Sequence, residues 1–217
     1  MTDTLSSAGR MTQRDLIRHL LSDGSVRRSA SLLADGVRPS ALADALEAGV
    51  VVRAAPGAYH LASSESPSFL LAIATACARA SGALVCLTTA AHLCGLLDEP
   101  PATVWIARPV GARVPKRGTI REQVVHWRNP GAFEVGVVRD VVCGVEVRRT
   151  NPVRTVVDVF RYARYVGGEE TALRIGSRFL RQGGDPGSVL VTAGAVGTPG
   201  KTLSALRAFL DAGPGSP

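Results

Sequence analysis

The stretch 36–61 changes its periodicity halfway along, and this change constrains the fold more than any other feature of the chain. Residues 39–48 place apolar side chains at helical spacing, and Gly49 stands where a left-handed residue can close a helix. Residues 50–61 then contain two short β-rich segments on either side of a Pro-Gly turn. We therefore expect a short helix followed directly by a tight hairpin, which is how a winged helix-turn-helix ends.

Two further helices are expected before this stretch. Thr12 and Asp15 have the spacing of a capping box, with Asp in place of the usual Glu, and an apolar stripe follows them up to Gly24. Ser25 is expected to cap a second helix, which carries Val26, Ala30 and Leu33. The alternative to a winged helix is a three-helix unit that packs on the rest of the chain and contacts no nucleic acid.

The chain is basic, but its excess of positive charge lies outside this first region. The 217 residues have a net charge of +7, whereas residues 1–65 contain seven basic and seven acidic residues. A positive chain suits an anionic partner without identifying one.

The remaining composition favours a cytoplasmic chain without a cofactor or a metal. None of the four cysteines forms a Cys-x-x-Cys pair, and the polar first 20 residues do not look like a signal peptide. No apolar segment reaches the length of a membrane span, so no membrane partner is expected.

The pattern as a whole predicts an α+β fold with two domains. Residues 62–67 form a short polar linker, so we expect a winged helix-turn-helix domain over residues 1–64 and a mixed α/β domain over residues 65–217, with a small sheet and a helical C-terminal tail. Strands are expected at 83–87, 103–107 and 124–128, with two more within 134–145. Helices are expected at 68–80, at 90–94 after a cap at Thr88 or Thr89, at 153–165, at 169–182, from 185, and at 202–212.

Four motifs occur in order between residues 36 and 158. The first, over the third helix and the hairpin, consists of Gly36, Val37, Leu42, Gly49, Val51, Arg53, Gly57, Tyr59 and Leu61. The second is a short helix that ends in His-x-x-Gly-Leu, with Thr89, Ala90, His92, Gly95 and Leu96. The third and fourth are His126-Trp127-Arg128 and the set Thr150, Pro152, Arg154, Thr155 and Asp158. This ordered set resembles the AbiEi family of antitoxins from type IV toxin–antitoxin systems.

The resemblance implies two functions. The winged helix would bind inverted repeats in the promoter of its own operon and repress it, so operator DNA is one expected partner. The second domain would neutralise a cognate nucleotidyltransferase toxin of the AbiEii type, the other expected partner. The oligomeric state is left open.

Six residues are candidates for DNA contact. Arg38 and Ser40 open the third helix, where side chains reach base edges, and Arg is the commonest reader of guanine. Arg27 and Arg28 on the second helix could clamp phosphates, as could Arg53 and His60 on the hairpin. A solvated surface pair is the alternative for Arg38 and Ser40.

Basic residues of the second domain are candidates for the surface that binds the toxin. They are Arg113, Lys116, Arg117, Arg128, Arg148, Arg149, Arg161 and Arg164. They could equally extend the DNA footprint.

Catalysis is not expected. Arg154 and Asp158 are four residues apart, so they would share one helix face, and we interpret them as an internal ion pair at a capped helix start. The spacing of His92, Cys86 and Cys94 matches no structural zinc site. Residues 197–202 resemble the end of a P-loop, but its first glycine is one position out of place, so a turn between helices is predicted.

The prediction is therefore a non-enzymatic antitoxin that also represses its own operon. One alternative is a winged-helix regulator whose second domain serves dimerisation or binds another ligand, with no toxin partner. Another is a protein–protein adaptor that binds no DNA, for which the neutral first region is the best support.

Overall fold

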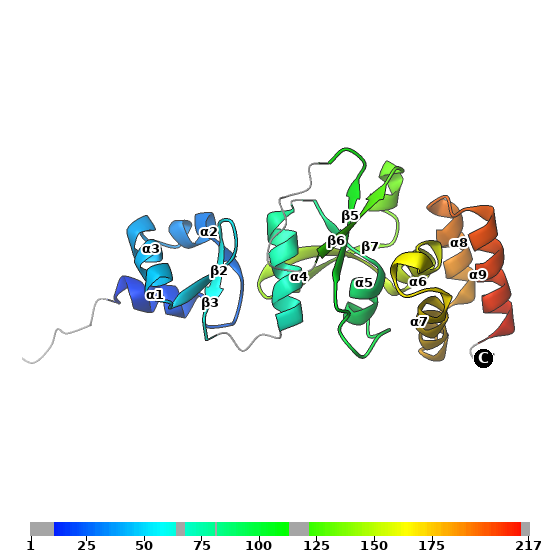
Figure 1. Ribbon diagram of the computed structural model, residues 1–217, viewed down its shortest axis with the longest axis horizontal. Coiled ribbons are helices and arrows are strands. Elements are labelled where there is room, and N and C mark those ends of the chain that lie inside the picture. The colour runs from blue at the N-terminus through cyan, green and yellow to red at the C-terminus, as the bar shows by residue number, and fades with distance from the viewer. Residues whose placement is uncertain (1–10, 64–67, 81, 113–121, 214–217) are drawn as a thin grey trace, which may run out of the picture.

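The computed structural model describes residues 11–63, 68–80, 82–112 and 122–213. These residues form an elongated molecule (Figure 1). A three-stranded sheet lies at the N-terminal end, a five-stranded sheet lies in the middle, and a group of helices lies at the C-terminal end. We call residues 11–63 the N-terminal part and the described residues from 68 onward the C-terminal part. The predicted boundary at residues 64 and 65 lies outside the described residues, so the division into domains stays a prediction.

The N-terminal part has the element order of a winged helix-turn-helix. Its elements are α1 (Gln13–Leu20), β1 (Arg27–Arg28), α2 (Ser29–Ala34), α3 (Pro39–Glu47), β2 (Val51–Ala55) and β3 (Ala58–Leu61). The strands form an antiparallel sheet in the order β1-β3-β2. The predicted succession of a helix and a tight hairpin is confirmed, and so is the cap of the first helix, because Thr12 Oγ1 accepts a hydrogen bond from the Asp15 backbone N–H at 3.2 Å.

The second helix was predicted wrongly. It begins at Ser29 rather than after Ser25, because Arg27 and Arg28 are extended and pair with Tyr59 and Ala58 of the hairpin. A strand of two residues leaves no periodic signal, so local sequence could not separate it from the helix that follows. The shift also changes the buried leucine, since Leu32 is fully buried and Leu33 is 40% exposed.

The C-terminal part is built on a mixed five-stranded sheet. Its strands are β4 (Leu84–Val85), β5 (Val104–Pro109), β6 (Glu122–Trp127), β7 (Val137–Val142) and β8 (Val145–Thr150), and they lie in the order β6-β5-β4-β8-β7. β4 pairs with β8 in parallel and with β5 in antiparallel orientation. The strands β5 and β6 are parallel, and β7 and β8 form an antiparallel hairpin. The predicted mixed α/β fold with a small sheet is confirmed.

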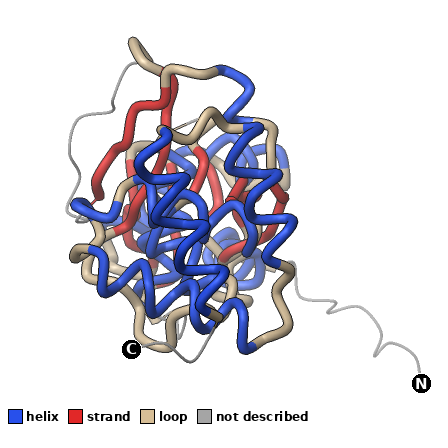
Figure 2. The backbone as a smooth tube through the Cα atoms, turned by 90° about the vertical axis from the view of Figure 1, so that its right-hand side faces the viewer, coloured by secondary structure: helices blue, strands red, loops and turns tan. Residues whose placement is uncertain are grey.

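Helices cover both faces of this sheet. The helices of the C-terminal part are α4 (Ser68–Arg79), α5 (Leu87–Leu93), α6 (Pro152–Arg161), α7 (Glu169–Arg181), α8 (Pro186–Ala195) and α9 (Gly200–Ala212), with 3-10 turns η1 (Pro130–Phe133) and η2 (Ala163–Tyr165). α4 packs on one face of the sheet and α5 and α6 pack on the other, while α7, α8 and α9 pack against α6 (Figure 1). One helix start was predicted wrongly: Cys86 is the N-cap of α5, so Thr88 and Thr89 lie inside the helix rather than capping it. Figure 2 views the molecule from its C-terminal end, with the helices in front of the strands.

Neighbouring residues of one strand enter different hydrophobic cores, as expected for a sheet covered on both faces. Leu84 joins the core of α5 to α9, whereas Val85 joins the core of α4. The core of α4 also contains Val26 and Ala58 from the N-terminal part. α4 therefore lies between the two sheets and packs against both (Figure 1).

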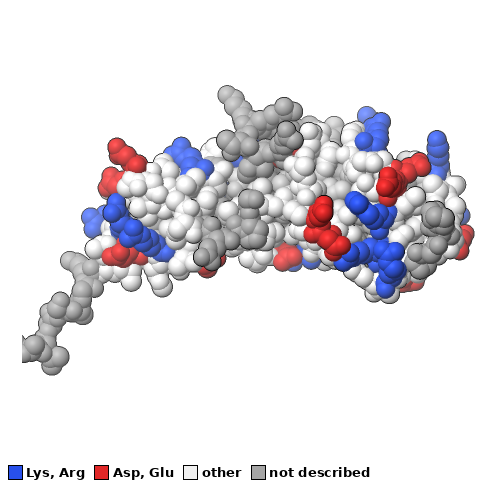
Figure 3. Space-filling view, turned by 60° about the horizontal axis from the view of Figure 1, so that its bottom comes forward, with Lys and Arg blue, Asp and Glu red and all other residues white. Residues whose placement is uncertain are grey.

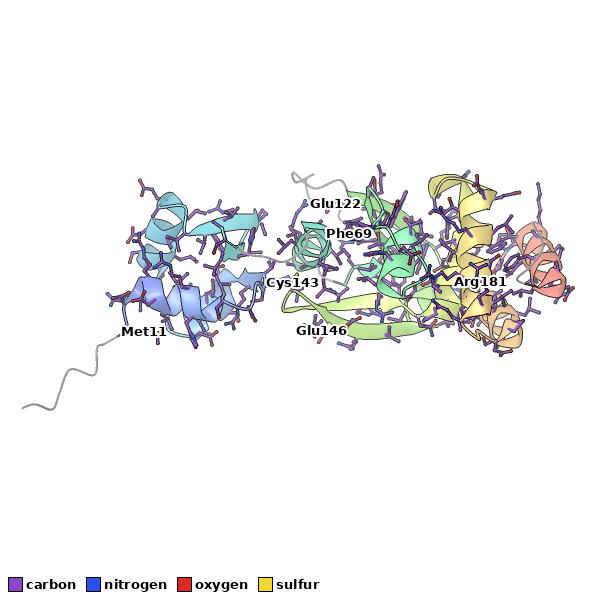
Figure 4. The ribbon with its side chains drawn as sticks, turned by 90° about the horizontal axis from the view of Figure 1, so that it is seen from below. Met11, Phe69, Glu122, Cys143, Glu146 and Arg181 are labelled. Atoms are coloured by element: carbon purple, nitrogen blue, oxygen red, sulfur yellow. The ribbon has the colours of Figure 1, made fainter. Side chains whose placement is uncertain are left out.

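Polar contacts join the same two parts. The Val26 backbone N–H donates to the Cys143 carbonyl at 2.7 Å, at the tip of the β7–β8 hairpin, which Figure 4 shows beside the N-terminal part. Arg28 donates to the Ala78 carbonyl near the end of α4.

None of the helices in the described residues is both long enough and apolar enough to span a membrane.

Candidate nucleic-acid interface

The turn between α2 and α3 is fixed by a side chain from α1. Gln13 Nε2 donates to the Gly36 carbonyl at 3.3 Å, and its Oε1 accepts from the Arg38 backbone N–H at 2.8 Å. Gly36 has φ +93°, a conformation that favours glycine. Val37 is buried between them, so the start of α3 is held in a defined position.

The exposed face of α3 is basic only at its start. Arg38, the N-cap residue, and Ser40 are exposed, as predicted. Asp44 and Glu47 are exposed further along the helix. Because carboxylates repel phosphates, contact between α3 and DNA would be confined to its first turn, where the helix dipole also favours negative charge.

The hairpin carries one exposed cation. The Arg53 guanidinium lies over the Tyr59 ring at 5.7 Å from the ring centroid and is exposed. His60 is half-buried, and its Nδ1 lies 2.8 Å from the Leu61 carbonyl. The turn at Pro56 and Gly57 bears no charge, so Arg53 is the group of the hairpin that suits a phosphate.

Arg27 and Arg28 have partners within the protein. Arg27 Nη2 lies 2.6 Å from Asp35 Oδ2 and donates to Ser31 Oγ at 3.2 Å. Arg28 is directed toward α4 by its bond to Ala78. Part of the hydrogen-bonding capacity of Arg27 and Arg28 is therefore used within the protein.

Two arginines on α1 were missed by the sequence reasoning. Arg14 and Arg18 are both exposed, and Arg14 directly follows Gln13, which contacts the start of α3. Arg18 lies 3.9 Å from Asp15, a separation at which an exposed ion pair contributes little. They lie on the polar side of the amphipathic pattern of α1, and that pattern is the sequence signal by which they could be found.

The candidate residues for toxin contact fall into three groups. Arg113, Lys116 and Arg117 lie outside the described residues. Arg128 and Arg164 are exposed. The other three are held by carboxylates: Arg148 by Glu134 at 3.1 Å, Arg149 by Asp140 at 2.9 Å and Arg161 by Asp158 at 3.5 Å.

The interpretation of Arg154 and Asp158 as an internal ion pair agrees with their geometry. Both side chains have zero exposure, and Arg154 Nε donates to Asp158 Oδ2 at 2.9 Å. Arg154 Nη1 also donates to the Ala132 and Val135 carbonyls at 2.9 and 2.7 Å, and its guanidinium lies 4.6 Å from the Trp127 ring centroid. Burial raises the pKa of the Asp158 carboxyl, and Arg154 and Arg161 oppose that rise. The pair locks the start of α6 to the sheet and to η1.

Cys77, Cys86 and His92 are packed within the C-terminal part. Cys86 is fully buried and burial raises the pKa of its thiol, while burial raises the pKa of the Cys77 thiol to about 12. His92 contacts the Phe69 ring edge-on at 5.4 Å. Within the described residues, no group of three His, Cys, Asp or Glu side chains could hold a metal ion.

Comparison with known proteins agrees with the motifs. Residues 83–175 match the model of the AbiEi antitoxin C-terminal domain, which confirms the resemblance over those residues and supports an antitoxin role, that of a regulatory and non-enzymatic kind of protein. No curated protein sequence matches the chain. Among solved structures, the crystal structure of the RV2827C protein from Mycobacterium tuberculosis has a similar fold, with a TM-score of 0.56 and 17% sequence identity over 92% of this chain and 82% of that chain.

Proposed function

We propose that this protein is an antitoxin that represses its own operon through the N-terminal part and neutralises a nucleotidyltransferase toxin through the C-terminal part. The observation that carries the proposal is the match of residues 83–175 to the AbiEi antitoxin C-terminal domain, in a chain whose preceding elements have the order of a winged helix-turn-helix.

The start of α3 is the best candidate for base contact. Arg38 and Ser40 are exposed there, and Gln13 fixes the backbone of the turn that presents them. A site on a fixed element needs little reordering when DNA binds, so less binding free energy is lost. Arg53 on the hairpin and Arg14 on α1 supply further positive charge for phosphates.

The N-terminal part of one protein molecule presents few exposed basic side chains for phosphate contact. This favours DNA binding by two protein molecules. Since Arg27 and Arg28 are engaged internally, each copy presents mainly Arg14, Arg18, Arg38 and Arg53. Inverted repeats place two half-sites about one helical turn or a multiple of it apart, so two copies would double the number of phosphate contacts. The proposal therefore includes two N-terminal parts on each operator.

The DNA-binding half is tested with the full-length protein and the DNA upstream of its own coding sequence. Fluorescence anisotropy across a salt series should show tight binding that weakens as salt rises. Arg38→Ala should weaken binding by about 1–3 kcal/mol, the range for one arginine that reads a base. The matched control is Arg139→Ala, an exposed arginine of the β7–β8 hairpin, which should bind like wild type. Absence of binding at low salt would overturn the repressor half and favour the adaptor alternative.

The toxin half is tested by co-expression. The full-length protein and the Arg38→Ala variant should both restore growth of cells that express the neighbouring nucleotidyltransferase, since α3 is far along the molecule from residues 83–175 (Figure 1). Failure of wild type to restore growth, together with intact DNA binding, would favour a regulator without a toxin partner.

A further inference from the structure

A cavity of about 670 Å³ opens on the C-terminal part, on the opposite side of the sheet from the N-terminal part. Its walls are the loop after α5, the strand β5, η2 and the helix α7. Its volume falls within the range of small-molecule sites, about 300–1,000 Å³. None of the candidate residues discussed above lines it.

Three arginines of α7 line one wall of this cavity. Arg174, Arg178 and Arg181 follow one another at intervals of four and three residues, so they share one face of the helix. Arg174 and Arg181 are exposed, and neither has a bonded partner among the described residues. Figure 3, which brings the lower side of Figure 1 forward, shows Lys and Arg side chains gathered beside acidic ones toward this end, and Figure 4 labels Arg181 on α7.

The third arginine holds the opposite rim in place. Arg178 Nη1 lies 2.5 Å from Asp98 Oδ2, and Gln182 Nε2 donates to the Gly95 carbonyl at 3.1 Å. Both bonds connect α7 to the loop after α5, whose Pro100 and Pro101 limit its freedom. The cavity is therefore largely formed before any ligand enters.

Two aromatic side chains, Trp105 and Tyr165, line the cavity. The Trp105 and Tyr165 ring centroids are 6.0 Å apart, with the planes inclined at 48°. Tyr165 is 44% exposed, so it is accessible from the cavity that it lines. Arg164 lies over the Tyr165 ring at 4.7 Å from the centroid, which orients the ring and adds positive charge.

We propose that this cavity binds a nucleoside phosphate. Arg174 and Arg181 would hold the phosphates, because guanidinium groups bind phosphate oxygens with two parallel hydrogen bonds. The base would stack on Tyr165 and Trp105, since every nucleobase has a flat π-face that packs on an aromatic ring. Asp98 forms an ion pair with Arg178 and also lines the cavity, so its carboxylate would accept a hydrogen bond from a ribose hydroxyl. The proposal does not depend on DNA binding or on a toxin partner.

The aromatic rings and the arginines together would let the cavity distinguish a nucleoside phosphate from a simpler anion. An inorganic phosphate would use the arginines alone, and an uncharged nucleoside would use the rings alone. The free nucleotide and the terminal nucleotide of an RNA share the same chemistry, so both belong in the test.

Isothermal titration of the full-length protein with ATP, GTP, CTP and UTP is the first measurement. At least one of them should bind, while tripolyphosphate and the matching nucleoside should each bind at least tenfold more weakly, because each retains only part of the contacts. A short single-stranded RNA with the matching 5′-triphosphate is the second arm, and tighter binding than the free nucleotide would identify an RNA end as the source. Absence of binding by every nucleotide and by the RNA would overturn the proposal, as would tripolyphosphate binding as tightly as the best nucleotide.

Variants assign the binding to the cavity. Arg174→Ala combined with Arg181→Ala should raise the Kd of the best nucleotide about tenfold or more, since the substitutions remove the charged hydrogen-bond donors to the phosphates. The control removes the same charge from an exposed site on α9 with Lys201→Ala and Arg207→Ala, and should leave the Kd unchanged. Tyr165→Ala should weaken binding and Tyr165→Phe should preserve it. Equal Kd values for the two double variants would place the ligand elsewhere and overturn the proposal.

Discussion

At the scale of single residues, the arginines of this chain fall into two groups: those with hydrogen-bond or ion-pair partners inside the protein, and those exposed to solvent. The sequence shows where arginines are, but their partners come from the fold: Asp35 is eight residues from Arg27, and Ala78 is fifty residues from Arg28. Arg38 and Ser40 were predicted at the start of the third helix, which is a local feature of the sequence, and they lie there and are exposed. The partners of Arg148 and Arg149 depend on strand pairing, which no short pattern in the sequence defines.

Removal of the buried Arg154 side chain should strongly destabilise the protein. Arg154→Ala should lower the free energy of unfolding by about 3–5 kcal/mol, because Asp158 would be left buried without its main partner. Urea unfolding followed by circular dichroism measures the change. Arg128→Ala, an exposed substitution, should stay within about 0.5 kcal/mol of wild type. A loss below 1 kcal/mol for Arg154→Ala would contradict the described geometry.

The ion pair of Asp140 and Arg149 should make a small contribution that depends on pH. The hydrogen bond from Arg149 lowers the pKa of the Asp140 carboxyl below its ordinary value of 3.8. A lowered pKa in the folded state stabilises the protein above about pH 4 and loses that contribution as the pH falls further. The difference in unfolding free energy between wild type and Asp140→Asn should therefore be positive at pH 6 and shrink toward pH 3. Since Asp140 is 41% exposed, the difference should stay below about 1 kcal/mol.

At the scale of elements, three of the longer helices were predicted closely, whereas β1 was missed and β8 (Val145–Thr150) lies almost wholly outside the expected range 134–145. The helices α4, α7 and α9 agree with their predictions to within two residues, because long periodic segments carry their own signal. β1 and β4 have two residues each, so they exist through pairing with strands distant in sequence. The same reason explains why α2 and α5 were given wrong starts, since each directly follows one of these short strands.

The tip of the β7–β8 hairpin should tolerate no side chain at Gly144. Gly144 has φ +71°, and an added Cβ would lie 2.5 Å from the Ser25 Cβ. Gly144→Ala should destabilise the protein by about 2 kcal/mol or more, from backbone strain and from this clash together. Gly95→Ala is the control for strain alone, because Gly95 has φ +70° and open space around its Cβ position. Adding Ser25→Gly should restore part of the stability of Gly144→Ala, and an equal loss with and without Ser25→Gly would exclude the clash.

At the scale of the whole molecule, the two parts share one hydrophobic core around α4. Val26 and Ala58 enter that core from the N-terminal part, while Val85 and Ile106 enter it from the five-stranded sheet. The composition could not show this, since the change from a polar linker to an apolar helix is also typical of two independent domains. What the sequence did predict at this scale is the order of a winged helix, a mixed sheet and a helical tail.

The shared core predicts one cooperative unfolding transition. Both tryptophans, Trp105 and Trp127, lie in the C-terminal part, so their fluorescence reports on that part alone. Far-UV circular dichroism reports on the helices of both parts, and its transition should coincide with that of the fluorescence. Loss of helix signal at a lower temperature, with unchanged tryptophan fluorescence, would show that the N-terminal part unfolds by itself.

The position of α4 also determines where such a chain can be recombined. A chimaera that takes its N-terminal part from one relative and the rest of the chain from another, joined at the polar linker, would pair the new hairpin with an α4 surface that has not adapted to it. A crossover placed after Arg79 would carry α4 together with its hairpin and would disrupt the fit to the five-stranded sheet instead. Either junction requires compensating changes on one side of the helix, so we expect the N-terminal part and α4 to be inherited together among related proteins.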